Sequence, residues 1–427
     1  MTPPRIVVAG ATTAITRRTV LRKMLWVPSD DLVHDGYLYA LALAQTKFDV
    51  RVHHGQGMAT HWHTCVTAMQ ANLPEFLRLV HRESARFRQE QLRAYGYDAP
   101  EVIWDGRRTH CMRLVDAGAQ LAWLLYEQLN CVAAGLVERV EDYPGWAPDF
   151  SLMKGRVVAV KRPALYFGKH QPEEIELKFS APPVLAQAFG GDLDAMVYWL
   201  GRGARELEDG YRTTRRREGR SVLGAECVRE LHPWSEPQTP REERGRRAPL
   251  FKVGGWFDTE RSLVVRQCEA EARAFVEGHR RAGRAWRAGD RTAVFPYGSY
   301  EMRVRHAANV ADPPEGAILC APGVVDFGVP AERKVHDARR LLDDISALVQ
   351  DAAAESVDDL TQGVYDAGLH DANDETTSPA PTQSTTSEVV ELEPPARSAT
   401  RAHVSRVITL RTRRSTHTGW RARGAPS

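Results

Sequence analysis

The triplet His61-Trp62-His63 constrains this chain most strongly, because it reads as part of an extended strand with two imidazoles on one face. Side chains alternate along a strand, so His61 and His63 point one way and Trp62 the other. The segments 48–53 and 61–66 form a predicted strand pair around intervening glycines. Two imidazoles on one sheet face can hold a divalent metal if a third ligand comes from elsewhere.

The triplet alone does not indicate a metal site, so its interpretation depends on the motifs around it. With 15 histidines in 427 residues, chance alone gives roughly 0.5 His-x-His pairs in a chain of this composition. A chain of 427 residues is also too long to fold around one compact core, so we expect two folded domains and tails.

Composition narrows the class of protein. The six cysteines are scattered without a Cys-x-x-Cys pair, which argues against a zinc knuckle and a disulfide framework. No apolar run is long enough to span a bilayer and the start has no signal-peptide shape, so we expect a cytoplasmic protein without a membrane partner.

Charge is unevenly placed behind a formal net charge of +2. Arginine-rich clusters lie at 212–220, 241–247 and 280–287, while acidic residues concentrate in 337–393. Local basic patches favour a nucleic-acid partner. For each single cluster, a solvated helix face is an equally weighted alternative.

Hydrophobic periodicity divides the chain into four parts. Residues 1–150 read as one compact α+β unit and 151–310 as a smaller, mostly helical accessory region that makes DNA contacts. Residues 311–365 read as a linker with a mixed-charge helix, and 366–427 as a disordered tail, because that tail has too few apolar residues to fold.

Local patterns predict the elements of the first part. Strands are expected at 5–9 and 14–17 with an interruption at Gly10, and helices at the ranges that show helical spacing of apolar residues, which are 30–46, 73–93 and 117–129. Two further helices are expected at 192–207 and 259–287.

Four blocks in one order resemble the REP-associated tyrosine transposases, a family of HUH-type single-strand DNA transposases. The blocks are Gly10-Ala11-x-x-x-Ile15-Thr16-x-Arg18, Met58-Ala59-Thr60-His61-Trp62-His63, Trp104-Asp105-Gly106-Arg107, and the stretch 126–137 that ends in Glu141-Asp142-Tyr143-Pro144. The resemblance covers about residues 6 to 146.

This resemblance implies a ferredoxin-like antiparallel sheet flanked by helices. It also implies metal-dependent nicking and strand transfer of single-stranded, hairpin-bearing DNA through a phosphotyrosine intermediate. The histidines His61 and His63 would hold Mg²⁺ or Mn²⁺. We expect a bacterial protein and allow for a homodimer.

The family places its nucleophile and third ligand on a helix, and we assign that helix to 73–93. This register puts Gln89 at the position of the metal-binding amide and Ser84 at the position of the tyrosine. A serine hydroxyl needs an activating base, and no such motif is visible although His81 lies one turn away.

Three interpretations follow from Ser84. The first is a lost active site on a retained DNA-binding fold, and the second is a displaced nucleophile, Tyr95 or Tyr97. The third is a different register, or attack by Ser84 itself. The rival functions are a catalytically inactive, domesticated DNA-binding regulator and an unrelated metal phosphodiesterase.

DNA contacts are expected from basic and aromatic residues near the sheet. Trp104 with Arg107 and Arg108 could stack on and clamp unpaired bases, with a buried tryptophan as the alternative. Arg17 and Arg18 belong to the same expected surface. Our interpretation of Tyr126, Asn130 and Tyr143 is structural, and His53, His54 and His110 read as ordinary histidines.

Overall fold

The computed structural model describes residues 4–107, 109–237, 249–254 and 259–313. The predicted mixed-charge helix and tail, within 314–427, and Arg108 lie outside the described residues. No helix in the described part of the chain is both long and apolar enough to cross a membrane.

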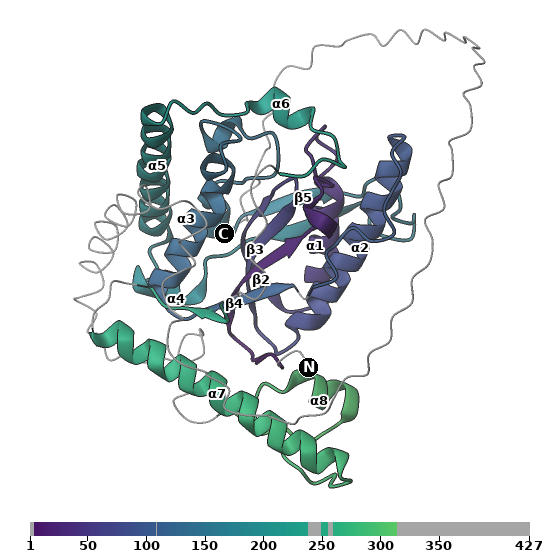
Figure 1. The fold of residues 1–427 in the computed structure, drawn as a ribbon, viewed down its shortest axis with the longest axis vertical. Helices are drawn as coiled ribbons and strands as arrows, with labels where there is room; N and C mark the ends of the chain where they lie inside the picture. Colours follow the sequence, from purple (N-terminus) through teal and green to yellow (C-terminus); the bar gives the residue numbers. More distant parts are fainter. Residues whose placement is uncertain (1–3, 108, 238–248, 255–258, 314–427) are drawn as a thin grey trace, which may run out of the picture. The chain divides into compact units, whose positions relative to one another are not determined.

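A five-stranded sheet forms the centre of the fold (Figure 1). Its strands are β2 (Val50–Gly57), β3 (His61–Ala68), β1 (Thr12–Arg18), β4 (His110–Leu114) and β7 (Phe251–Lys252), in that spatial order. The first four pair antiparallel and β7 joins β4 in parallel.

Two helices cover one face of the sheet. They are α1 (Asp35–Gln45) and α2 (Leu73–Ala94), which pack on each other and on the core that contains Ile15 and Trp62. The order β1-α1-β2-β3-α2-β4 with spatial order 2-3-1-4 confirms the predicted α+β, ferredoxin-like arrangement.

The opposite face is covered by α3 (Ala117–Ala133), α4 (Pro183–Ala188) and α5 (Leu193–Arg217). Helix α3 begins where the Asp116 carboxylate accepts the backbone N–H of Ala119, so an orphan donor of its first turn is satisfied. The sheet is therefore sandwiched between two separate helical layers.

The region after residue 150 builds onto both layers. A hairpin of β5 (Val157–Lys161) and β6 (Glu174–Lys178) adds Ile175 and Leu177 to the core with α1 and α2, while Leu200 of α5 packs with α3. Residues before and after the boundary predicted near residue 150 therefore pack in the same hydrophobic cores.

The remaining elements are short or peripheral. They are the helices α6 (Ala225–Arg229), α7 (Thr259–Arg287) and α8 (Tyr300–His306), and the 3-10 turns η1 (Val20–Arg22), η2 (Val140–Asp142) and η3 (Phe150–Lys154). Helix α7 has the predicted bounds and α2 ends one residue later than predicted.

The strand predicted at 5–9 is wrong. That segment has no strand structure, and β1 begins only at Thr12, after Gly10 turns the chain with a left-handed φ of 75°. Val7 instead donates its N–H to the carbonyl of Gly298, so the segment lies against the loop before α8.

Candidate functional site

The histidine pair lies on the sheet face that α3 covers. Along β3, Trp62 packs on the α1 side, where its ring stacks on Tyr37 at 3.7 Å between centroids. Cys65 packs with α3 on the other side, and alternation places His61 and His63 on this same side.

The two imidazoles form a compact pair. Their ring centroids are 4.6 Å apart and their planes are inclined by 82°. The Thr60 hydroxyl lies 2.9 Å from His61 Nδ1, and the Thr16 hydroxyl lies 3.0 Å from His63 Nδ1. Since each Nδ1 is engaged by a threonine, each Nε2 is the nitrogen left for a metal.

The threonine contacts follow from strand register. Thr16 of β1 is directly opposite His63 in the antiparallel β1–β3 ladder, and Arg18 is directly opposite His61. Residues opposite each other share a sheet face, so the ladder also brings Arg18 to the histidine side. The predicted DNA contact Arg18 therefore lies beside the histidines.

Electrostatics keep both histidines neutral. Burial, followed by the charges of Arg18 and Arg22, lowers the pKa of His61 to about 3. Burial, followed by His61 and Arg18, also lowers the pKa of His63 well below its usual value. Neutral imidazoles can bind a cation, while the arginines favour an anionic ligand.

A left-handed turn brings Arg22 to this edge. Leu21 and Arg22 have φ angles of 52° and 57°, an uncommon conformation for residues with a side chain. The Thr19 hydroxyl holds the turn by contacting the carbonyls of Lys23 at 2.6 Å and Thr60 at 2.9 Å. Thr60, whose hydroxyl contacts His61, therefore also holds this turn through its backbone carbonyl.

Helix α3 presents three side chains to the histidine pair. The amide Nδ2 of Asn130 lies 3.3 Å from His63 Nε2. The rings of Trp123 and Tyr126 lie 5.5 Å and 5.6 Å from the His63 ring, both close to perpendicular to it. Tyr126 and Asn130 are four residues apart, so they share one helix face.

A buried network of hydrogen bonds fixes the part of α3 that carries these three side chains. Glu127 accepts hydrogen bonds from His54 Nδ1 at 2.8 Å and from Trp123 Nε1 at 2.7 Å. His54 Nε2 lies 3.0 Å from the carbonyl of Pro148, which can only accept, so both ring nitrogens carry protons. His54 and Glu127 are thus a buried ion pair.

Ser84 is not brought to the histidines. It lies on α2, within the layer on the other face of the sheet, and it is fully buried. Its hydroxyl donates to the carbonyl of His81 in its own helix, at 3.4 Å. The predicted register on α2 fails on geometry, because the sheet separates that helix from the histidine face.

Gln89 lies on the same helix as Ser84, and its side chain contacts the loop after α2 instead of the histidine pair. Its amide nitrogen donates to the carbonyls of Pro100 at 2.9 Å and Glu101 at 2.8 Å, in the loop that follows α2. The amide therefore secures that loop, and no contact links it to His61 or His63 within the described residues.

The two candidate displaced nucleophiles also lie with α2. Tyr95 donates its hydroxyl to Asp30 at 2.6 Å, and burial together with Asp30 raises its pKa to about 12. Tyr97 packs against the core of α1 and α2, and its ring meets His232 at 5.2 Å. Both side chains thus have partners on the face away from the histidine pair.

The predicted base-stacking cluster is assembled differently. Trp104 is buried, stacks on Trp26 at 5.4 Å and donates Nε1–H to the backbone carbonyl of His81, so its ring faces the core. Arg17 lies over the same ring at 5.9 Å and donates to the carbonyl of Arg107. Arg107 is exposed and pairs with Asp105. Arg108 lies outside the described ranges.

Sequence reasoning missed Tyr126 and Asn130 as functional candidates. They belong to the stretch with the strongest family resemblance, and their spacing of one helical turn matches a nucleophile followed by an amide ligand. That spacing was the available signal. The sequence alone favours a structural role for both, with Asn130 stopping the helix, and favours the helix at 73–93 for the nucleophile because it directly follows the histidine strand.

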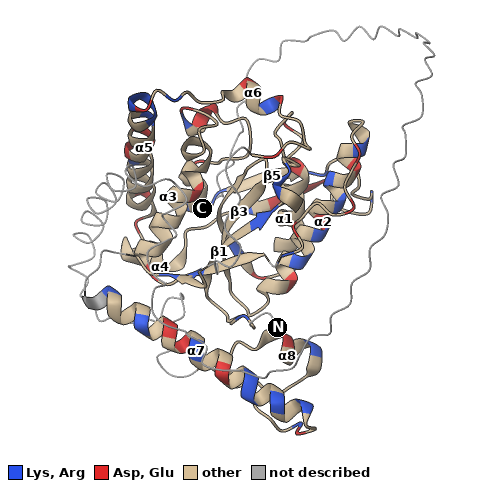
Figure 2. Cartoon of the chain, viewed as in Figure 1, with Lys and Arg blue, Asp and Glu red and all other residues tan. Residues whose placement is uncertain are grey.

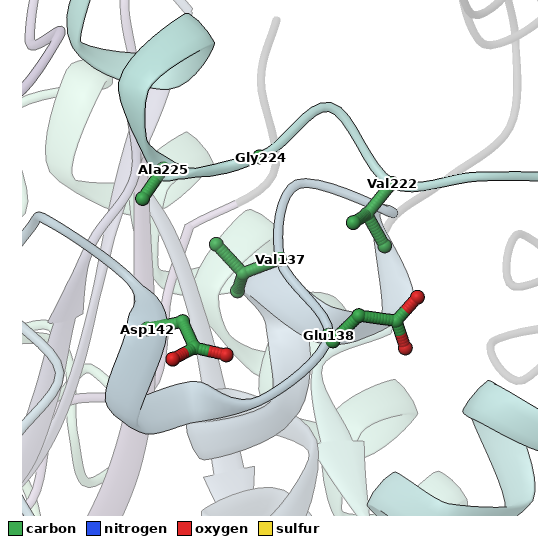
Figure 3. Close-up of a pocket in the computed structure, with 6 residues that line it drawn as sticks. All are labelled: Val137, Glu138, Asp142, Val222, Gly224 and Ala225. Atoms are coloured by element: carbon green, nitrogen blue, oxygen red, sulfur yellow. The ribbon is translucent and has the colours of Figure 1, made fainter.

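Figure 3 shows a separate pocket of about 260 Å³ beyond the end of α3. It is lined by Val137, Glu138, Asp142, Val222, Gly224 and Ala225. The carboxylate of Glu138 lies 3.3 Å from Arg212 and 3.4 Å from Arg215, so it neutralises part of α5. Two carboxylates in the lining make the pocket unsuited to a phosphate.

Within the described ranges, no three or more His, Cys, Asp or Glu side chains gather as a metal site. A cation at the histidine pair would therefore need a neutral third ligand. An amide oxygen meets that need, and Asn130 is the amide in contact with His63. Rotation of the amide by half a turn exchanges its nitrogen and oxygen.

Comparison with protein-family models and with curated proteins finds no match for the chain. A solved structure of a REP-associated tyrosine transposase bound to a REP hairpin is similar to part of it. The identity is 16%, the match covers 34% of this chain and 90% of that chain, and the TM-score is 0.27. The function is therefore inferred from the side chains around His61 and His63.

Proposed function

We propose that this protein is a metal-dependent DNA-nicking enzyme of the transposase type, acting on single-stranded, hairpin-bearing DNA. One observation carries the proposal: Tyr126 and Asn130 stand one turn apart on α3, and both contact His63. A tyrosine ring, an amide and two neutral imidazoles then lie together on one sheet face. This combination serves attack on a phosphodiester.

His61, His63 and Asn130 are the residues that would hold the cation. Both imidazoles are neutral, as metal ligands must be, and their Nδ1 atoms are oriented by Thr60 and Thr16. When bound, Mg²⁺ or Mn²⁺ supplies Lewis-acid polarisation of the scissile phosphate and stabilises developing negative charge.

Tyr126 is the proposed nucleophile. Its Oη forms a bond to phosphorus while the bond between phosphorus and the 3′-oxygen breaks, which leaves a 5′-phosphotyrosine and a 3′-hydroxyl. The proton released by Tyr126 balances the proton gained by the 3′-oxygen. The packing of Trp123 between Glu127 and His63 fixes the helix turn that carries this tyrosine.

Arg18 and Arg22 are proposed to bind phosphates next to the histidine pair. Both charges act on His61, and a strand of DNA brings the negative charge that such a site attracts. Hairpin-bearing DNA is the substrate that the resemblance to the REP-associated tyrosine transposases implies. Strand transfer and homodimer formation stay predictions from the sequence.

The test uses the full-length protein and a labelled hairpin with a single-stranded flank. We expect nicking with Mn²⁺ or Mg²⁺, none with a chelator, and loss of nicking in His63→Ala and Tyr126→Phe. The matched control Ser84→Ala should nick normally. Binding without nicking under every metal condition would contradict the proposal and support the domesticated DNA-binding regulator.

A further inference from the structure

The C-terminal half of α7 carries a stripe of arginines on its outer face. From Gly278 to Arg291 the sequence has five arginines and one acidic residue, Asp290. Arg280, Arg284 and Arg287 are spaced by four and three residues, so they share one face of the helix. Figure 2 shows the basic colour gathering at this end of α7 and on α8.

These three side chains point away from the protein core. Ala282, Trp286 and Phe295 pack together on the inner side of the helix, whereas Arg280, Arg284 and Arg287 are exposed. None of the three takes part in an ion pair with a described residue. Their charge is therefore available to an external partner.

The helix that carries the stripe is firmly held. Glu271 of α7 lies 2.5 Å from Arg113 of β4, both largely buried, and also accepts the hydroxyl of Tyr297. The guanidinium of Arg291 lies 4.4 Å over the Trp286 ring, which fixes the turn after α7. A helix held in this way presents its three arginines at a fixed spacing, which favours recognition of a regular partner.

The stripe lies at the end of the sheet opposite the histidine pair. Gly298, just before α8, accepts the N–H of Val7, and Arg303 of α8 donates to the carbonyl of Ala71. Ala71 comes three residues after the end of β3. The histidine His61 opens the same strand. Eight residues of β3 separate the two ends by about 23 Å at ~3.3 Å per residue.

We infer that the arginines Arg280, Arg284 and Arg287 form a second DNA contact, which binds the phosphate backbone of a duplex segment flanking the nicking site. The stripe is about 10.5 Å long at ~1.5 Å per residue, which matches about three phosphates of one strand at ~3.4 Å each. The inference rests on the proposed function in one respect, namely that DNA is the substrate.

Arginines on phosphates hold DNA in place without reading its sequence. The stripe therefore sets affinity and salt dependence for a paired stem, while the chemistry stays at the histidine pair. A short single strand bound at the histidine face does not reach the stripe, since the length of β3 alone, about 23 Å at ~3.3 Å per residue, lies between His61 and the end of the sheet near α8.

The experiment measures binding of a fluorescent 20-base-pair blunt duplex, in chelator, from 50 to 200 mM salt. The full-length protein is compared with Arg284→Gln/Arg287→Gln and with a matched control, Arg78→Gln/Arg93→Gln, on the exposed side of α2. We expect the slope of log K against log salt to become shallower by about 1.8 in the stripe variant, at ~0.9 per phosphate contact. The control should keep the wild-type slope.

Three results would overturn the inference: an unchanged slope, an equal loss in the control, or a wild-type protein that binds anionic lipid vesicles but no duplex. Nicking of the labelled hairpin with a single-stranded flank is measured in parallel at saturating protein, and should be equal in all three proteins. Failure of that nicking in the wild type counts against the proposed function, and leaves the duplex slopes as a separate result.

Discussion

The side-chain amide of Asn130 lies 3.3 Å from Nε2 of His63, which ties helix α3 directly to the histidine strand. We expect Asn130→Ala to weaken Mn²⁺ binding at least tenfold, about 1.4 kcal/mol, because an oxygen ligand is lost. Asn130→Asp retains an oxygen and adds a negative charge, so it should bind Mn²⁺ at least as tightly as the wild type.

Isothermal titration of Mn²⁺ into the metal-free proteins checks both variants. Equal affinity for all three proteins would show that Asn130 is not a ligand, and would leave the histidine pair with another partner.

Thr16 and Thr60 orient the two histidines, so their hydroxyls should matter for the metal without touching it. We expect Thr16→Val and Thr60→Val each to reduce Mn²⁺ affinity by about 10- to 100-fold, the range for groups that orient ligands. Thr12→Val is the control, since its hydroxyl bonds to Thr67 at the far end of the same strands. A loss in the control equal to that in the other two would point to a general strand defect.

The pair of His54 and Glu127 stabilises the helix that carries Tyr126. Burial alone would lower the pKa of His54, but the Glu127 carboxylate raises it above its usual value. In Glu127→Gln, burial leaves the His54 ring neutral, and the ion pair and its charged hydrogen bond are lost, so we expect a loss of about 1.5–3 kcal/mol in unfolding free energy. Chemical denaturation measures it. A loss below about 1 kcal/mol would mean that the pair contributes little.

Buried His34 gives the fold a specific pH dependence. The backbone N–H of Trp146 donates to His34 Nδ1 at 2.8 Å, so the folded protein holds this ring neutral. Burial lowers the pKa of His34 to about 4. Between about pH 6.5 and 4 the unfolded chain binds a proton that the folded chain does not, and stability falls as pH falls.

The size of this effect follows from one proton per histidine. We expect His34→Gln to flatten the plot of unfolding free energy against pH by about 1.4 kcal/mol per pH unit within that window. Unfolding in urea at several pH values between 4 and 7 measures the slope. Parallel plots for the wild type and the variant would contradict the assignment of His34 as neutral when folded.

Most of the fold could be predicted from local patterns, and the arrangement of the site could not. Alternation along β3 correctly separates Trp62 from the neighbouring histidines, because a strand has a fixed period of two. Nothing in that period says which helix covers which face. Helix α2 follows β3 directly in sequence but packs on the Trp62 side, so closeness in sequence wrongly favours Ser84 as a neighbour of the histidines.

The same limit applies to Trp104. Its neighbouring arginines made an exposed base-stacking ring plausible, whereas stacking on Trp26 places it in the core. Burial of a tryptophan depends on residues distant in sequence. Tyr126 and Asn130 are equally visible in the sequence, but only the packing of α3 on the histidine side of the sheet brings them to His63 and suggests the role that we propose for them.

The covalent site on the protein tests the central claim most directly. The protein is incubated with Mn²⁺ and a single-stranded DNA hairpin, digested, and the peptide carrying the nucleotide is sequenced by mass spectrometry. We predict a phosphotyrosine at Tyr126, lost in Tyr126→Phe and retained in Tyr95→Phe. An adduct on Tyr95 or Tyr97, or cleavage with no adduct, would contradict the assignment of Tyr126 as the nucleophile.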